Sequence, residues 1–404
     1  MKRLSFLVAA ALVLGAGPGE AQAPAVIKVG VLNDMSGPYA DLSGKGSVIA
    51  AQMAADDFMQ KAGAGGPRVE ILSADHQNKA DVGATIARGW VDRDGVAAVV
   101  DVPNSAVGLA VNQVMREKDR AFLASSTATS DLTGPQCSPT TVQWTFDTWA
   151  QANGTVRAIA AQGGRNWFFI GSDYALGASL IRDATPVIKA MGGMVVGDVR
   201  APLGTTDLSS YLLQAQASGA DVIGTANAGG DVVNTIKQAA EFGVGRDGRQ
   251  RLAGLLVFLT DVQSMGLQTA QGLLLTEAFY WDLNEGTRAW SKRFAERAGG
   301  RMPTMNHAGV YSETLAYLRA AQAVGGISGA AVVAKMTEGT IDDALFGPTT
   351  IRRDGRAVHA MYLFRVKKPS DSRGPYDLYD VVATIPAAEA FRPMAEGGCP
   401  LVAR

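Results

Sequence analysis

From residue 26 onward, apolar runs that suit β-strands alternate with longer segments whose apolar positions recur about every 3.6 residues. The run 27–32 is typical of a buried strand. The segment 47–61 is typical of an amphipathic helix, with Val48, Ala51, Ala55 and Phe58 on one face. The same pattern predicts further strands at 69–72, 96–100 and 121–124 and helices at 82–93 and 105–118. Such an alternation predicts a parallel sheet covered by helices on both faces.

A second series of the same kind follows the first. It predicts strands at 167–170, 194–199, 221–224, 255–259 and 273–275, with helices at 178–191, 208–217 and 231–242. The stretch 287–338 breaks the alternation and is expected to be helical, and strands return at 349–352 and 361–366. The chain of 404 residues is long enough for more than one domain. We therefore expect an α/β protein with two similar lobes.

The first residues have the pattern of an export signal. Lys2 and Arg3 precede the uncharged apolar run 4–16, and small residues follow as far as Ala21-Gln22-Ala23. A membrane-spanning helix needs about 20 apolar residues, so the run is short for an anchor. We expect residues 1–23 to be a cleaved signal peptide and the mature protein to be periplasmic.

Composition excludes some classes of function. With 47% hydrophobic residues, 19% charged residues and a net charge of −1, the chain is typical of a globular protein and lacks the basic excess that nucleic acid binding requires. Only 3 His and 2 Cys are present, so a metal site built from these residue types is not expected. After export, Cys137 and Cys399 enter an oxidising compartment, where we expect them to form a disulfide bond.

The motifs that carry most enzyme chemistry are absent. The nearest approach to a phosphate-binding loop, at 37–47, has mis-spaced glycines, and no GxGxxG follows the first strand. Neither a GxSxG nucleophile motif nor an HExxH zinc motif occurs. We expect no cofactor and no enzymatic activity. The competing hypothesis, a secreted hydrolase, requires Ser105 or Ser126 within hydrogen-bonding distance of His76 or His307.

Polar loops follow several of the expected strands. In open α/β sheets, ligands bind beyond the carboxyl ends of the strands. The loops that hold these positions are 33–46, 101–105, 125–129, 172–174 and 227–230. Their hydroxyls, amides and helix-start N–H groups suit a carboxylate, and Tyr39 and Tyr174 are placed to form aromatic walls. The competing interpretation is that these Ser, Thr, Asn and Asp residues only cap helices.

At this point the residues resemble a known family. Residues 27–58 (IKVGVLNDMSGPYADLSGKGSVIAAQMAADDF) are similar to the opening of periplasmic binding proteins of the leucine/isoleucine/valine-binding family. These proteins are the substrate-binding components of ABC importers for hydrophobic amino acids and related small acids. The resemblance continues at 121–133 (AFLASSTATSDLT), 169–180 (FIGSDYALGASL), 227–243, 271–282 and 302–312 (MPTMNHAGVYS). It therefore spans nearly the whole mature chain.

The resemblance implies two Rossmann-like lobes with parallel sheets, joined by a hinge that the chain crosses three times. The crossings are expected near 144–147, near 279–281 and near Met361. One lobe would then comprise residues 26–145 and 283–360, and the other residues 146–282 and 361–404. The lobes would close on a ligand like a trap.

The resemblance also implies a set of site residues. The ligand carboxylate would be held by the loop at Asn104 and Ser105 and by the loop at Ser126 and Thr127. Asn104 stands where Ser is common, Ala128 where Thr is common, and Leu176 where Tyr is common. Thr260 occupies the position of the acid that holds the ammonium group of amino acids, with Asp261 adjacent; Asn306 and His307 lie near the cleft. The expected ligand-binding residues are Tyr39, Asn104, Ser105, Ser126, Thr127, Tyr174, Asn227 and Asp261.

The expected function is capture of a small ligand for an ABC permease in the membrane. The ligand is expected to bear a carboxylate: a hydrophobic amino acid, an aromatic or aliphatic acid, or else an amide. A monomer is the simplest state for a protein that docks and releases. A periplasmic sensor that signals to a membrane receptor is the alternative from a second class, beside the hydrolase.

Overall fold

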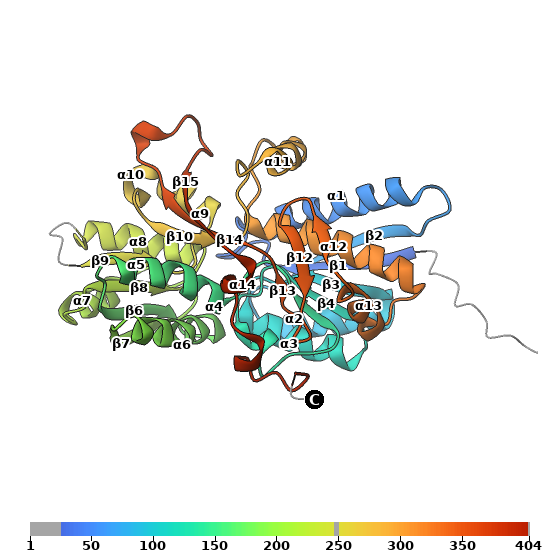
Figure 1. The fold of residues 1–404 in the computed structure, drawn as a ribbon, viewed down its shortest axis with the longest axis horizontal. Helices are drawn as coiled ribbons and strands as arrows, with labels where there is room; N and C mark the ends of the chain where they lie inside the picture. Colours follow the sequence, from blue (N-terminus) through green and yellow to red (C-terminus); the bar gives the residue numbers. More distant parts are fainter. Residues whose placement is uncertain (1–25, 246–249, 403–404) are drawn as a thin grey trace, which may run out of the picture.

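A computed structural model describes residues 26–245 and 250–402 of the chain. The expected signal peptide lies outside these residues. The fold consists of two lobes side by side, each built around its own parallel sheet (Figure 1). The expected fold class, a two-lobed α/β protein with parallel sheets, is confirmed.

The first lobe contains a five-stranded parallel sheet of order β2-β1-β3-β4-β5. Its central strand β3 (Val96–Asp101) is buried throughout, and the side chains of Ala98 and Val100 enter a different core from that of Val99. This alternation follows from the two-residue period of a strand and gives the sheet a helical layer on each face. The other strands are β1 (Val26–Asn33), β2 (Arg68–Asp75), β4 (Ala121–Ala124) and β5 (Thr141–Gln143).

Two helical layers cover this sheet. One core joins α1 (Gly44–Ala62) to α12 (Met305–Val324), and the other joins α2 (Ala80–Gly89) to α3 (Ser105–Glu117). Helix α12 thus returns to the first lobe from far along the chain (Figure 1). Smaller elements complete this part of the molecule: η1 (Trp90–Asp94), η2 (Ser130–Thr133), α13 (Gly329–Met336), β11 (Ile341–Asp343), β12 (Gly347–Ile351) and β13 (Ala357–Val358).

The second lobe contains a parallel sheet of order β7-β6-β8-β9 and an antiparallel sheet of order β10-β14-β15. In β6 (Asn166–Ser172), Trp167 and Phe169 pack with α6 (Ala175–Ala190), whereas Phe168 and Ile170 pack with α7 (Ser209–Ala217). The remaining strands are β7 (Met194–Ala201), β8 (Val222–Ala226), β9 (Arg251–Gly254), β10 (Leu274–Glu277), β14 (Met361–Val366) and β15 (Tyr379–Ile385). The remaining helices are α4 (Thr148–Gln151), η3 (Ala152–Val156), α5 (Arg157–Ala161), α8 (Gly230–Glu241), α9 (Leu259–Met265), α10 (Leu267–Ala270) and η4 (Pro369–Asp371).

The chain passes between the two lobes after β5, after β10 and after β13. The second passage leads into α11 (Glu285–Arg297), and the third leads from β13 directly into β14. The exact lobe boundaries remain a prediction. One expected strand, 255–259, is wrong, because β9 ends at Gly254 and α9 begins at Leu259. The apolar residues between them, Leu255–Phe258, are all buried, and Leu256 and Phe258 line the cavity between the lobes.

The end of the chain is tied to the first lobe. Cys137 and Cys399 form the expected disulfide, with their Cα atoms 5.7 Å apart. Phe391 packs on His359, and the Arg392 guanidinium donates to the Ser130 carbonyl (3.1 Å). This tail contains α14 (Ala387–Ala390) and η5 (Met394–Glu396). We therefore propose that residues 387–402 belong with the first lobe rather than with the second.

Candidate functional site

The two lobes touch each other beyond the carboxyl ends of their strands. The N–H of Gly230, at the start of α8, donates to the Pro38 carbonyl of the first lobe (2.9 Å). Beside this contact, the hydroxyls of Tyr39 and Tyr174 are hydrogen-bonded to each other across the lobes. The molecule is therefore in a closed conformation.

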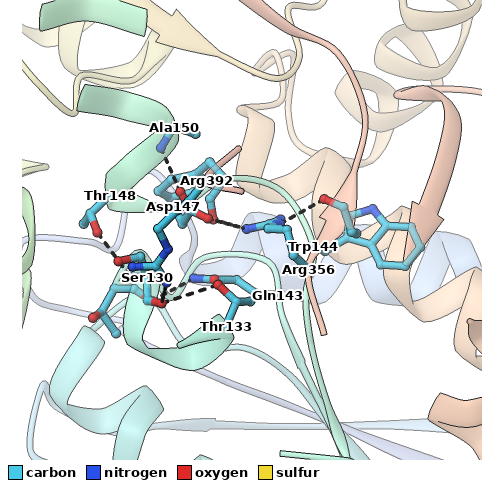
Figure 2. A network of polar contacts seen from close by, with 12 residues as sticks. Ser130, Thr133, Gln143, Trp144, Asp147, Thr148, Ala150, Arg356 and Arg392 are labelled. Atoms are coloured by element: carbon cyan, nitrogen blue, oxygen red, sulfur yellow. Dashed lines mark hydrogen bonds and ion pairs between the residues drawn. The ribbon is translucent and has the colours of Figure 1, made fainter. Parts of the chain in front are cut away.

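A second group of contacts between the lobes lies nearer the hinge. The Ser130 hydroxyl donates to Asp183 (2.6 Å) and the hydroxyls of Thr129 and Ser179 are 2.8 Å apart. Arg182 forms an ion pair with Asp131 at 2.6 Å. Ser130 sits in a polar network that reaches the buried Arg356 at the passage after β5 (Figure 2). These contacts connect α6 of the second lobe to the loop after β4.

A narrow cavity lies between the closed lobes, and its empty volume of about 230 Å³ includes space that is open to solvent. Its walls come from both lobes and from Phe146 at the first passage, and apolar side chains predominate among them. Among the described residues, the lining contains no Lys, Arg, His, Asp or Glu. The lining residues are Tyr39, Leu42, Pro103, Ser126, Ala128, Phe146, Leu176, Ala228, Leu256, Phe258 and Asn306. Such a mostly apolar chamber with a few polar groups is typical of a site for a small molecule.

Asn306 is the most informative polar group of the cavity. It lies in the first turn of α12 and is fully buried. Both its Oδ1 and its Nδ2 lack a hydrogen-bond partner among the described residues. A buried amide left unpaired costs about 1–3 kcal/mol per polar atom. Asn306 is therefore poised to bind something that enters the cavity.

Behind the cavity wall, Asp101 collects several donors. The hydroxyls of Ser43 and Ser126 and the amide of Asn33 (3.0 Å) all donate to its fully buried carboxylate. Burial raises the pKa of Asp101, and these hydrogen bonds oppose that rise. Asp101 thus fixes Ser126 at the cavity wall. The backbone of Asp101 has a φ of 80°, which tertiary contacts of this kind hold in place.

Three of the sequence-predicted ligand residues meet at the cavity. Tyr39 and Ser126 line it, and Tyr174 closes over Tyr39 through its hydroxyl. Burial raises the pKa of both Tyr174 and Tyr39 above the ordinary value of tyrosine, so both hydroxyls keep their protons. Tyr39 lies in the loop between β1 and α1, and Tyr174 lies in the loop between β6 and α6. These two loops meet where the lobes touch, although they are far apart in the chain.

Three other predicted residues support the loops instead. Asn104 caps α3, with its side-chain oxygen accepting from the N–H groups of Ala106 (3.0 Å) and Val107 (3.2 Å). The Ser105 hydroxyl accepts from the N–H of Thr129 (3.3 Å). The Thr127 hydroxyl donates to the carbonyl of Val102 (2.5 Å). None of the three lines the cavity, and direct contact of these side chains with a ligand remains a prediction.

The last two predicted residues lie in the second lobe. Asn227 donates to Thr235 (2.9 Å), while its Oδ1 is buried without a partner among the described residues. Asp261 accepts from the N–H of Phe258 (2.9 Å) at the start of α9. Burial raises the pKa of Asp261 to about 7. Neither residue lines the cavity, so the ammonium-binding role expected of Asp261 also remains a prediction.

The raised pKa of Asp261 leads to a pH-dependent prediction. A carboxyl whose pKa is higher in the folded protein than in the unfolded chain stabilises the fold less as pH rises through the folded value. Asp261→Asn keeps the oxygen that accepts from Phe258. We expect it to raise the free energy of unfolding at pH 8, by about 1–3 kcal/mol, and to have little effect at pH 4. Urea unfolding at both pH values measures this, and an equal effect at both would contradict it.

Among the described residues, no hydrogen bond joins Ser105 or Ser126 to His76 or His307, as the hydrolase hypothesis requires. The Ser126 hydroxyl donates to Asp101, and that of Ser105 accepts from a backbone N–H. His307 uses both ring nitrogens, one accepting from the N–H of Thr304 (3.1 Å) and the other bonded to the Ser43 carbonyl (2.9 Å). Burial lowers the pKa of His307 to about 4. It joins the start of α12 to the loop before α1.

Some lining residues were not singled out from the sequence. Phe146, Leu256 and Phe258 form much of the apolar wall. Leu256 and Phe258 belong to the apolar run 255–259, for which the sequence predicts a strand. These two residues are apolar because they line the cavity. Their position in the sequence is the signal that could have identified them as lining residues. They directly follow the short strand β9, at the edge of the sheet where the strands have their carboxyl ends.

Outside the cavity, a wider recess opens to solvent between the lobes. Asp41 and Lys45 of the first lobe and Thr260 and Gln263 of the second border it, with Arg301 beyond α11. It holds about 1530 Å³ of empty space, open solvent included. Because it lies on both lobes beside the loop that carries Tyr39, it is the mouth of the cleft that closure narrows.

Two lobes closed over a largely apolar cavity define a ligand-trapping protein. The comparisons with known proteins give the class: a family model for periplasmic binding proteins matches residues 26–373. The chain belongs to this family, whose members bind solutes in the periplasm for ABC importers and are not enzymes.

Solved structures and a curated relative agree with this assignment. A periplasmic binding protein from Burkholderia mallei shares 44% sequence identity with a TM-score of 0.89, over 93% of this chain and 99% of that one. A branched-chain amino acid ABC transporter periplasmic ligand-binding protein from Burkholderia xenovorans shares 41% identity with a TM-score of 0.81, over 93% and 99% of the two chains. Leu/Ile/Val-binding protein homolog 6 of Brucella melitensis is 26% identical over 384 residues, or 92% of this chain and 94% of the relative.

Within residues 26–245 and 250–402, no helix combines the length and the apolar character needed to cross a membrane. The same part of the chain contains no cluster of three or more His, Cys, Asp or Glu side chains arranged to hold a metal ion.

Proposed function

We propose that the protein captures a compact, largely apolar solute in the cavity between its lobes and delivers it to the permease of an ABC importer. The observation that carries this proposal is the cavity, lined from both lobes and containing the unpaired amide of Asn306. The family assignment supports the solute-binding role. The identity of the permease and the monomeric state are parts of the proposal.

Closure accounts for ligand capture without covalent chemistry. Asn306 and Ser126 belong to the first lobe, and Leu176, Ala228 and Phe258 to the second. A ligand contacts both sets only when the lobes are closed, so binding shifts the population toward the closed state. The Tyr39–Tyr174 pair and the Gly230–Pro38 hydrogen bond then hold the lobes together.

Export and delivery complete the proposal. Residues 1–23 are proposed to direct the chain to the periplasm and to be removed there, which also allows the Cys137–Cys399 disulfide to form. The closed conformation places fixed surfaces of both lobes toward a partner. A permease that recognises both surfaces would distinguish the loaded protein from the empty one.

A thermal-shift screen of the exported protein tests this function. The panel comprises aliphatic amino acids, aromatic and aliphatic carboxylates, and small amides. A micromolar ligand at millimolar concentration stabilises the native state by about 4 kcal/mol, which gives a clear shift in Tm. A saturable shift with one chemical class is expected. No shift with any class, together with turnover of an ester or amide substrate, would contradict the proposal.

A further inference from the structure

The two unpaired atoms of Asn306 specify the kind of polar group that fits the cavity. The side-chain amide carries an acceptor, Oδ1, and a donor, Nδ2, on one planar group. Both are buried, and neither has a partner among the described residues. A ligand that satisfies both atoms must itself offer one acceptor and one donor side by side.

Charged groups do not meet this requirement. A carboxylate has only acceptors, so it satisfies Nδ2 and faces Oδ1 with a second negative oxygen. An ammonium group has only donors and leaves Nδ2 unpaired, and an amino acid zwitterion, which offers both kinds of group, brings two charges that each need a counterion. A primary or secondary amide presents a carbonyl oxygen next to an N–H, which is the complement of the Asn306 edge.

The rest of the lining also disfavours a charged ligand. The described residues that line the cavity include no cationic side chain to neutralise a carboxylate and no acidic side chain to neutralise an ammonium group. Asp101 stands behind Ser126 and already accepts three hydrogen bonds. Burying a charge without a counterion costs far more than burying a neutral polar group.

The body of the ligand faces apolar walls. Leu42, Leu176 and Leu256 surround it with aliphatic groups, while Phe146 and Phe258 pack edge to face with ring centroids 5.9 Å apart. The cavity between the closed lobes is narrow, which favours a compact apolar body.

We propose that the solute is a neutral primary or secondary amide with one compact apolar substituent, aromatic or branched aliphatic, whose amide edge pairs with Asn306. This inference rests on the proposed function and specifies its ligand. Amino acids and simple carboxylates are then poor ligands, although a branched-chain amino acid transporter protein is among the relatives.

Pairs of ligands with the same shape test the inference. Calorimetric titration would compare benzamide with benzoate and isovaleramide with isovalerate, with leucine included. We expect each amide to bind about tenfold to 100-fold more tightly than its carboxylate. A carboxylate or leucine that binds as tightly as the amide would overturn the inference while leaving the proposed function in place. If no member of the pairs binds, the inference is also wrong, and the wider screen decides on the function.

Variants at Asn306 separate ligand recognition from a structural role. Asn306→Leu keeps the branching of the side chain, replaces the amide oxygen and nitrogen by methyl groups, and so removes both unpaired atoms. It is expected to unfold no more easily than the parent protein and to lose the amide preference. Asn306→Asp keeps the acceptor and replaces the donor, so amide affinity should fall about tenfold. Retention of the parent's amide preference by either variant would contradict the inference.

Asn284 provides a matched control. It stands at the start of α11 and caps that helix by accepting from the N–H of Thr287 (3.0 Å). Asn284→Leu is expected to lower stability while leaving the amide preference unchanged. Equal losses of binding in the two Asn→Leu variants would show that the effect at Asn306 is only structural, and this would overturn the inference.

Discussion

Arg356→Ala is expected to destabilise the protein by about 3–5 kcal/mol, the usual cost of removing one partner from a buried ion pair. The Arg356 side chain is completely buried, and it pairs with Asp147, which is 2% exposed, at 3.4 Å. It also donates to the carbonyls of Phe146 (2.9 Å) and Ala357 (2.9 Å). Figure 2 shows this position, where Asp147 begins α4 just after the first passage between the lobes.

The loss arises mainly from what remains after the substitution. Of its hydrogen-bond partners among the described residues, the Asp147 carboxylate would keep the N–H of Ala150 (2.8 Å) in a buried environment. The Phe391 ring, which stacks under the guanidinium at 4.5 Å, would also lose its contact. Desolvation lowers the pKa of Arg356 to about 10, which indicates how closely it is enclosed.

Urea unfolding measures this effect, and a second variant identifies its cause. Asp147→Asn combined with Arg356→Met removes both charges while keeping an oxygen that accepts from Ala150. We expect this double variant to recover at least half of the lost stability. A loss under about 1 kcal/mol in Arg356→Ala, the value typical of an exposed pair, would contradict the argument.

The second large effect is expected for Gly229→Ala, which should hinder the closure of the two lobes. A Cβ added at Gly229 would meet the carbonyl oxygen of Pro38 in the opposite lobe at less than van der Waals distance. Because that atom belongs to the backbone, the lobes must move apart to relieve the contact. Overpacking of this kind costs about 1–3 kcal/mol, so Gly229→Ala should weaken ligand binding about fivefold to 150-fold.

Gly229 also has a φ of 60°, so the substitution strains the backbone in both the open and the closed state. Gly266→Ala is the matched control, since its φ is 78° and nothing lies within 4 Å of the added Cβ. Both variants should lose similar stability, but only Gly229→Ala should lose affinity. Calorimetric titration of both variants measures this difference. Equal affinity in the two would show that Gly229 does not limit closure.

The fold was largely predictable from the sequence because buried positions repeat at regular intervals along its strands and helices. In strands such as β3, alternate residues enter different cores, and helices such as α1 bury one face, so the pattern appears directly in the sequence. The wrong strand at 255–259 shows the limit of this signal. A buried apolar run is compatible both with a strand and with an irregular wall, and only tertiary contacts separate them.

The site was predictable only in part. Tyr39, Ser126 and Tyr174 meet at the cavity because strand-end loops share one edge of each lobe. Asn104 caps α3, its contact with a ligand remains a prediction, and sequence alone does not distinguish these two uses of Asn.

The role proposed for Asn306 could not be predicted from the sequence, because it does not follow from the residue type. Its role follows from two atoms without partners among the described residues, which is a property of the folded arrangement. The resemblance to the family placed both Asn306 and His307 near the cleft and gave no reason to prefer Asn306. In the structure, both ring nitrogens of His307 are hydrogen-bonded to backbone groups.

Small-angle X-ray scattering of the exported protein, with and without a saturating ligand from the screen, tests the central claim most directly. We expect the radius of gyration to fall on ligand addition to the value calculated from the closed structure. Gly229→Ala should remain larger than the parent at the same ligand concentration. A radius of gyration that ligand leaves unchanged, at a value larger than that of the closed structure, would contradict capture by lobe closure.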